Sequence, residues 1–119
     1  MFDFSVTELS SGVADLNTDE LQEALGRIYD YTVLIVEDDL DIQGYLQVEL
    51  KRNFRVLVAD NGVKALEVLM SEEVSIVVSD VMMPEMNGFD LCRKIKSDIV
   101  LSHLPVLLLT ALSDDRQQM

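Results

Sequence analysis

The chain has 119 residues, of which 49% are hydrophobic, so it can form one compact domain with a buried core but not two such domains. Its formal net charge of -13 at pH 7 disfavours binding of this segment to nucleic acid or to an anionic membrane surface, since both are polyanions. The single cysteine excludes a disulfide within the chain and indicates a cytosolic setting, and no apolar run approaches the ~20 residues of a membrane span.

Residues 1–30 are predicted to form a linker followed by a short amphipathic helix. Residues 1–17 mix Ser, Gly, Asp and Asn with scattered apolar residues, which is typical of a linker. Asn17 is suited to cap a helix, and Glu20 lies three residues later, as in a capping box. The segment 18–29 then carries apolar residues at helical spacing, namely Leu21, Ala24, Leu25, Ile28 and Tyr29.

Residues 31–119 alternate between strand and helix patterns and are predicted to form one domain. Four short apolar runs are typical of buried strands and cover residues 33–36, 55–59, 74–79 and 105–111. Inward-facing residues at helical spacing fill the intervals: Ile42, Tyr45, Leu46 and Leu50, then Ala65, Leu66, Leu69 and Met70, then Phe89, Cys92 and Ile95. A last helix is predicted to begin at Ser113. This alternation indicates an α/β fold with a parallel sheet covered by helices.

The most informative polar residues stand where the predicted strands end. Glu37 and Asp38 directly follow the first strand, and Asp80 follows the third. Thr110 lies at the end of the fourth strand. The carboxyl ends of parallel strands form the ligand crevice of such sheets, so these side chains are expected to converge. Three converging carboxylates repel one another, and a hard divalent ion such as Mg²⁺ would relieve that repulsion. A carboxylate beside a metal, with a hydroxyl nearby, suits phosphoryl transfer to an aspartate.

Several motifs together resemble the receiver domain of response regulators in bacterial two-component signalling. The resemblance runs from about Thr32 to Met119 and is carried by four stretches: VLIVEDD (33–39), Asn61-Gly62, VVSDVMMPEMNGFDL (77–91) and LPVLLLTA (104–111). It implies a flavodoxin-like (CheY-like) doubly wound parallel sheet, with the first four strands in the order 2-1-3-4.

The resemblance also implies a role for each matching residue. Asp80 matches the aspartate that accepts the phosphoryl group as an acyl phosphate. Glu37 and Asp38 match the acidic pair that holds Mg²⁺ (or Mn²⁺) together with that aspartate. Met82 matches the position whose backbone carbonyl completes the metal site, so its side chain need not be polar.

Further matches concern the switch and the loop after the acceptor. Thr110 matches the hydroxyl that turns inward to bond a phosphoryl oxygen, and Ala111 matches the small residue that leaves room for that group. Pro84 and Gly88 match the turn that shapes the loop. Asp39 lies one residue past the acidic pair and is predicted to cap the following helix.

The family has a fifth strand, which ends in a lysine that pairs with the phosphoryl group, and a fifth helix. Neither matches anything before Met119, so we expect a truncated receiver from a longer protein. The fourth strand would then be a bare sheet edge, open to a homodimer or to a strand or helix exchanged between chains. The helix over 18–29 would either occupy the place of the fifth helix or project away and pair with its copy.

The expected function is that of a phosphorylation-controlled switch in a phosphorelay. The domain would take a phosphoryl group from a histidine kinase or a histidine phosphotransfer domain, which could belong to the same parent chain. It would catalyse its own phosphorylation and dephosphorylation without being an enzyme for a separate substrate. A hybrid sensor histidine kinase, with any membrane anchor outside this segment, is the favoured parent, and a response regulator with an output domain is the competitor.

Two other classes remain open at this point. A pseudo-receiver would be a protein-binding module without phosphorylation, and a small phosphatase would need a general acid or a cap domain. The remaining reactive residues have plainer interpretations: His103 is expected on the surface, and Cys92 in the core. Met82 and Leu112, which stand at positions that tune phosphoryl lifetime in the family, are apolar and predict slow hydrolysis.

Overall fold

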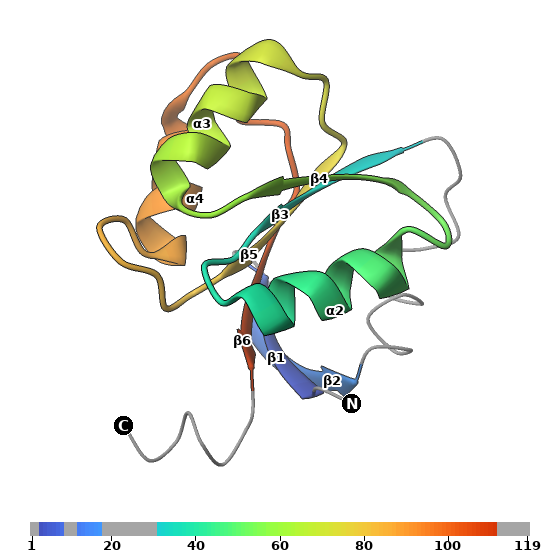
Figure 1. Ribbon diagram of the computed structural model, residues 1–119. Helices are drawn as coiled ribbons and strands as arrows, with labels where there is room; N and C mark the ends of the chain where they lie inside the picture. Colours follow the sequence, from blue (N-terminus) through green and yellow to red (C-terminus); the bar gives the residue numbers. More distant parts are fainter. Residues whose placement is uncertain (1–2, 9–11, 18–30, 112–119) are drawn as a thin grey trace.

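The computed structural model of the protein describes residues 3–8, 12–17 and 31–111. Within these residues the elements follow one another as β1 (Asp3–Glu8), β2 (Gly12–Asn17), β3 (Thr32–Val36), α2 (Leu40–Leu50), β4 (Arg55–Ala59), α3 (Gly62–Ser71), β5 (Ile76–Asp80), α4 (Gly88–Ser97) and β6 (Val106–Ala111). All the described strands belong to one sheet in the order β2-β1-β6-β5-β3-β4 (Figure 1).

The parallel part of the sheet confirms the predicted fold class. β3 pairs in parallel with β4 on one side and with β5 on the other, and β5 pairs in parallel with β6. When β3 is numbered as the first strand of the predicted domain, the strands β4, β3, β5 and β6 lie in the order 2-1-3-4, as expected. β3 is the central strand, and each of its residues Thr32–Val36 is buried, which explains why the sequence there lacks polar alternation.

Helices cover both faces of the sheet (Figure 1). On one face, α2 contributes Ile42, Leu46 and Leu50 to a core with Val33 and Ile35. On the other face, α3 and α4 share a larger core with the opposite side of the same strands; its helix residues include Ala65, Leu69, Leu91, Cys92 and Ile95. The parallel part of the sheet is thus packed on both sides, and its acidic residues Glu37 and Asp80 lie at strand ends.

Each helix in the described residues begins with an Asp or Asn side chain that caps its first turn. Asp39 accepts hydrogen bonds from the backbone N–H groups of Asp41 and Ile42, which confirms the prediction that it caps α2. Asn61 caps α3 and Asn87 caps α4 in the same way. α2, α3 and α4 each follow a strand, so the loops that carry the polar residues end at these caps.

The N-terminal segment differs from the prediction. Residues 3–8 and 12–17, interpreted from sequence as part of a linker, form an antiparallel pair, and β1 also pairs antiparallel with β6. The expectation that the strand at 105–111 has a bare edge is therefore wrong, because β1 covers it. An open strand edge offers a row of backbone hydrogen-bonding groups, and a nearby segment that can extend will pair with it. The predicted helix at 18–29 lies outside the described residues.

Two predicted inward residues face solvent instead. Met70 is 74% exposed and Phe89 is 40% exposed. Met70 directly follows the buried Leu69, and Phe89 directly follows the buried Gly88. One step along a helix turns the side chain by about 100°, which directs both residues away from the buried face. Cys92 is buried and His103 is exposed, as predicted. The predicted helix that begins at Ser113 lies outside the described residues.

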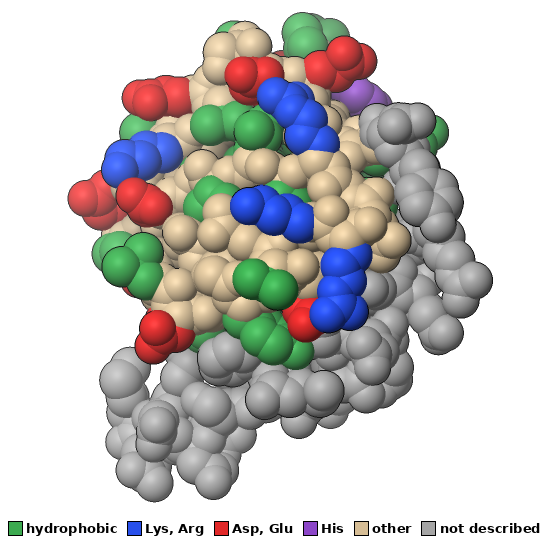
Figure 2. Space-filling view, turned by 45° about the vertical axis from the view of Figure 1, so that its right-hand side comes forward, with side chains coloured by type: hydrophobic (Ala, Val, Ile, Leu, Met, Phe, Trp, Pro, Cys, Tyr) green, Lys and Arg blue, Asp and Glu red, His purple; other side chains and the backbone are tan. Residues whose placement is uncertain are grey.

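The surface mixes charged and apolar side chains. On the face shown in Figure 2, hydrophobic side chains form separate patches between acidic and basic ones. Among the helices that the structure describes, none is long and apolar enough to cross a membrane.

Candidate functional site

Three carboxylates converge at the carboxyl ends of β3 and β5. Glu37, Asp38 and Asp80 each offer an oxygen atom, and these atoms all lie within 4.8 Å of one another. Glu37 is 2% exposed and Asp80 is 6% exposed, whereas Asp38 lies on the surface. The structure therefore brings together the acidic residues that the sequence predicted to converge.

Strand pairing explains this convergence. Val36 of β3 pairs with Ser79 of β5, and the two strands run in parallel. Glu37 and Asp80 directly follow this pair, so they lie side by side at the carboxyl ends of the strands. The backbone N–H of Glu37 also donates to the carbonyl of Ala59 at the end of β4, with an N–O distance of 3.1 Å. The position of Glu37 is thus set by both neighbours of β3 in the sheet.

The donor set fits a hard divalent cation. Two buried carboxylates and one exposed carboxylate supply only oxygen ligands, the donor type that Mg²⁺ prefers, and the exposed member lies where water could reach a bound ion. Bringing three negative charges this close is electrostatically costly without a cation, because they repel and two of them are largely removed from water. Glu37, Asp38 and Asp80 are therefore the residues that could hold Mg²⁺.

One hydrogen bond restrains the carboxylate of Asp80, and another restrains its backbone carbonyl. The N–H of Met82 donates to Oδ1 of Asp80 at 3.3 Å, and the hydroxyl of Ser79 donates to the carbonyl of Asp80 at 3.0 Å. The N–H of Gly88 donates to the carbonyl of Val81 at 2.9 Å, which ties the start of α4 to the end of β5. The side chain of Met82 is 64% exposed and takes no part in the core.

The loop from Met82 to Gly88 folds back over the end of β5. Glu85 has a positive φ of 67°, an uncommon conformation for a residue with a side chain, and it follows Pro84 as part of a tight turn. The N–H of Met86 donates to the carbonyl of Pro84 at 2.7 Å. Met86 packs closely against Gly62 at the start of α3, so this loop is also supported from the next helix.

The remaining predicted site residues lie on β6. Asp80 pairs with Leu109 in the register of β5 and β6, and Thr110 is one residue further along, where it is half-buried. Ala111 ends the strand. On the opposite side of β6, Ser5 of β1 pairs with Thr110, so the N-terminal hairpin lies directly beside the predicted switch residue.

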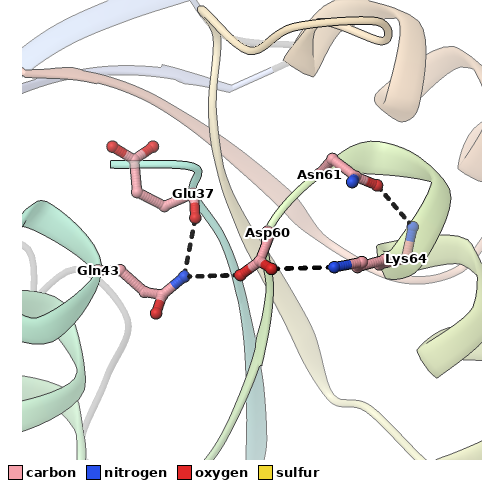
Figure 3. A network of polar contacts seen from close by, with 5 residues as sticks. All are labelled: Glu37, Gln43, Asp60, Asn61 and Lys64. Carbon is pink, nitrogen blue, oxygen red and sulfur yellow. Dashed lines mark hydrogen bonds and ion pairs between the residues drawn. The ribbon is translucent and has the colours of Figure 1, made fainter. Parts of the chain in front are cut away.

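One polar network at this end of the sheet was not foreseen from the sequence. Gln43 of α2, Asp60 after β4 and Lys64 of α3 are joined by side-chain hydrogen bonds next to Glu37 (Figure 3). The four-residue separation of Asp60 and Lys64 is a sequence signal for an ion pair at a helix start. No sequence pattern connects Gln43 to either of them, because that contact depends on the packing of α2 beside β4.

Comparison with known proteins identifies the family. The model of the response regulator receiver domain matches residues 33–119 of the chain. The chain belongs to the response regulator receiver domain family. The matched region of this receiver domain begins at β3 and contains all three clustered carboxylates.

Relatives of the receiver domain include much longer proteins. It is 41% identical over 98 residues to a histidine kinase P4 of Formosa agariphila, covering 82% of this chain and 7% of that protein. It is 36% identical over 84 residues to the sensor histidine kinase TmoS of Ectopseudomonas mendocina, covering 71% of this chain and 9% of that protein. It is 39% identical to the transcriptional regulatory protein GltR of Pseudomonas aeruginosa, covering 71% of this chain and 35% of that protein. The chain thus spans only a small part of these relatives.

Solved receiver structures share the fold. The N-terminal domain of a response regulator receiver protein from Methanoculleus marisnigri has a TM-score of 0.66 at 33% identity, with 74% of each chain covered. The signal receiver domain of a signal transduction histidine kinase from Syntrophus aciditrophicus also has a TM-score of 0.66, at 37% identity, with 74% of this chain and 67% of that chain covered.

Proposed function

We propose that this receiver domain accepts a phosphoryl group from a phosphohistidine onto Asp80, with Mg²⁺ held by Glu37, Asp38 and Asp80. The observation that carries the proposal is the cluster of these three carboxylates within 4.8 Å at the carboxyl ends of β3 and β5. When bound, the cation would neutralise charge on the phosphoryl oxygens and let them approach the acids.

In the proposed reaction, the residues of the chain position and receive the phosphoryl group. A carboxylate oxygen of Asp80 forms a bond to phosphorus as the P–N bond to the donor imidazole breaks, and the electron pair of that bond leaves with the imidazole. The product is an acyl phosphate. The hydrogen bond from the N–H of Met82 to Oδ1 holds the carboxylate in one rotational position and thereby orients it for attack.

Residues on β6 would complete the site. The hydroxyl of Thr110 would donate a hydrogen bond to a phosphoryl oxygen, and the small side chain of Ala111 would leave space for the group. The backbone carbonyl of Met82 would serve as a further metal ligand. Movement of Thr110 toward the new charge would then shift the end of β6 between two arrangements, which is the switch.

The donor would be a histidine kinase or a histidine phosphotransfer domain. The favoured parent is a hybrid sensor histidine kinase in which this domain lies on the cytoplasmic side. The match to the Formosa agariphila histidine kinase supports that choice. It covers 98 residues, which is more than the range 33–119 contains, so the similarity to that kinase extends into the segment before Val33. A response regulator with an output domain is the second candidate, which the relative GltR supports.

The test of the proposal is phosphorylation by a small phosphodonor. Wild-type protein with acetyl phosphate and Mg²⁺ is expected to gain one hydroxylamine-sensitive phosphoryl group, measured by mass spectrometry of the intact protein. Asp80→Asn removes the nucleophile and is expected to abolish the gain. Asp39→Asn is the matched control, because Asn is an equally good helix cap and the residue lies outside the carboxylate cluster. Equal labelling of wild type and Asp80→Asn would overturn the proposal.

The same experiment tests the alternative that the domain is a pseudo-receiver. A binding module without phosphorylation would gain no phosphoryl group in either protein. If label is gained, its lifetime gives a second result: the apolar residues Met82 and Leu112 cannot orient an attacking water, so loss of the label in buffer is expected to be slow.

A further inference from the structure

A short chain of polar contacts runs from α2 to α3 beside Glu37 (Figure 3). Nε2 of Gln43 donates to the backbone carbonyl of Glu37 at 2.9 Å and lies 3.4 Å from Oδ1 of Asp60. Nζ of Lys64 donates to Oδ2 of Asp60 at 3.0 Å. The backbone N–H of Lys64 donates to Oδ1 of Asn61, the cap of α3, at 2.9 Å. The side-chain contacts of Gln43 and Lys64 thus connect α2 and α3 with the residues that follow β3 and β4.

The network acts on the peptide group that connects the two clustered acids. The carbonyl that accepts from Gln43 belongs to the peptide bond between Glu37 and Asp38. The N–H of Glu37 is bound on its other side by the carbonyl of Ala59. The N–H and the carbonyl of Glu37 lie in the peptide groups before and after its Cα, so the two bonds restrain φ and ψ of Glu37 and with them the directions of the Glu37 and Asp38 side chains.

Asp60 determines how the amide of Gln43 is oriented. A half-turn of that amide would place its Oε1 against two acceptors, the carbonyl of Glu37 and the carboxylate of Asp60, and both contacts would be repulsive. The hydrogen bonds from Lys64 and Gln43 and the charge of Lys64 lower the pKa of Asp60 below its usual value of 3.8, so the carboxylate is ionised at neutral pH and keeps its charge further into the acid range. Its carboxylate therefore acts as a fixed acceptor that presents the N–H groups of Gln43 to Glu37.

We propose that Gln43, oriented by Asp60, is a positioning residue for the carboxylates of Glu37 and Asp38. The inference rests on the proposed function, because it gives these carboxylates the task of holding Mg²⁺. Gln43 does not touch the clustered oxygens; it acts through the backbone of Glu37. It neutralises no charge either, so its effect is on geometry.

The first test compares the Mg²⁺ affinity of matched variants by isothermal titration calorimetry. Gln43→Leu keeps the size of the side chain but cannot donate, and it is expected to raise the Mg²⁺ Kd by about 3- to 10-fold, the range for loss of one neutral hydrogen bond. Gln47→Leu, one turn later on the same helix, is the control and should leave Kd unchanged. The urea midpoint of each variant shows whether the change in Kd is separate from a general loss of stability.

The second test isolates the acceptor role of Asp60 from its charge. Asp60→Ala and Asp60→Asn remove the same charge, but Asn retains an oxygen that can accept from Gln43. Asp60→Asn is expected to bind Mg²⁺ more tightly than Asp60→Ala. Hydrogen exchange at the amides of Asp38 and Asp39 in metal-free protein provides a readout that requires no Mg²⁺, and exchange should be faster in Gln43→Leu than in wild type.

The outcomes separate the two proposals. A Gln43→Leu protein with the Mg²⁺ Kd and amide exchange of wild type, while Asp38→Asn binds Mg²⁺ poorly, would overturn the positioning role alone. Wild-type protein that binds no Mg²⁺, or an Asp38→Asn protein that binds it as well as wild type, would overturn the metal site, and the positioning role toward a metal would fail with it.

Discussion

Gly88 stands where the first turn of α4 comes closest to the backbone of Asp80. A Cβ atom at this position would lie 2.4 Å from the carbonyl oxygen of Asp80 and 3.0 Å from Cα of Val81. Both neighbours are backbone atoms, which cannot rotate away, so a larger residue would force β5 and α4 apart. This glycine is therefore required by close approach and not by an unusual dihedral angle.

We predict that Gly88→Ala lowers the free energy of unfolding by about 1 to 3 kcal/mol, the typical range for overpacking a tight site. Urea denaturation measures this change. Gly44→Ala is the control, because a Cβ atom there meets nothing within 4 Å and the residue lies inside α2. That variant should be more stable than wild type by about 0.5 to 1 kcal/mol. Similar stability of both variants would contradict the steric explanation.

Asp60 gives a prediction for the dependence of stability on pH. Its pKa is lowered in the folded protein from a usual value of 3.8, so it favours folding when ionised. This contribution is present above the unfolded pKa and is lost as the pH falls through the lower folded pKa. Between about pH 5 and pH 2, the urea midpoint of wild type should therefore fall further than that of Asp60→Asn. Parallel pH profiles of the two proteins would contradict this.

At the scale of elements, the main addition is the hairpin of β1 and β2. β1 runs antiparallel to β6, and the pairs extend from Phe4 with Ala111 to Glu8 with Leu107. β1 thus covers the outer edge of β6, the last of the parallel strands. An exposed strand edge is a template for association with another chain, so β1 shields β6 from such pairing, and β2 takes the outer position in the described sheet.

We predict that Val6→Pro exposes this edge. Proline cannot donate to a strand ladder, and Val6 pairs with both Leu109 and Ala14 in the middle of β1. Amide hydrogen exchange along β6 should become faster, and sedimentation should reveal association that increases with protein concentration. Val6→Thr is the control, since it keeps the N–H group and a β-branched side chain. Unchanged exchange in β6 would show that β1 does not protect it.

At the scale of the whole molecule, the net charge of -13 sets the electrostatic background. Excess negative charge opposes the compact state, and any salt screens that repulsion. A cation that binds specifically to the carboxylate cluster should act more strongly than screening alone. The carboxylates of Glu37, Asp38 and Asp80 concentrate part of this charge at one end of the sheet.

We predict that MgCl₂ raises the free energy of unfolding more than NaCl at equal ionic strength. The extra stabilisation should reach about 1.4 kcal/mol when the Mg²⁺ concentration is about ten times its Kd. Thermal unfolding followed by circular dichroism measures the difference. In Asp38→Asn, which lacks one ligand, the two salts should have nearly the same effect. An identical response of wild type to both salts would contradict specific binding.

Much of the parallel domain could be predicted because its determinants are local. Continuous apolar runs such as Val33–Val36 indicate strands buried on both faces, and Asp39 and Asn61 mark helix starts with their own side chains. The convergence of Glu37 with Asp80 follows from topology, since parallel strands bring their carboxyl ends to one edge. Local chemistry and chain order were sufficient for these features.

The sequence alone determined the strand-and-helix alternation and placed the acidic residues at the strand ends. Contacts between distant parts of the chain were needed to establish that residues 3–8 and 12–17 join the sheet and that Gln43 contacts the carbonyl of Glu37. The reason is physical: both features depend on partners distant in sequence. A polar segment pairs as a strand only when an open edge such as that of β6 is beside it, and an amide finds its acceptors only after α2 packs against the sheet.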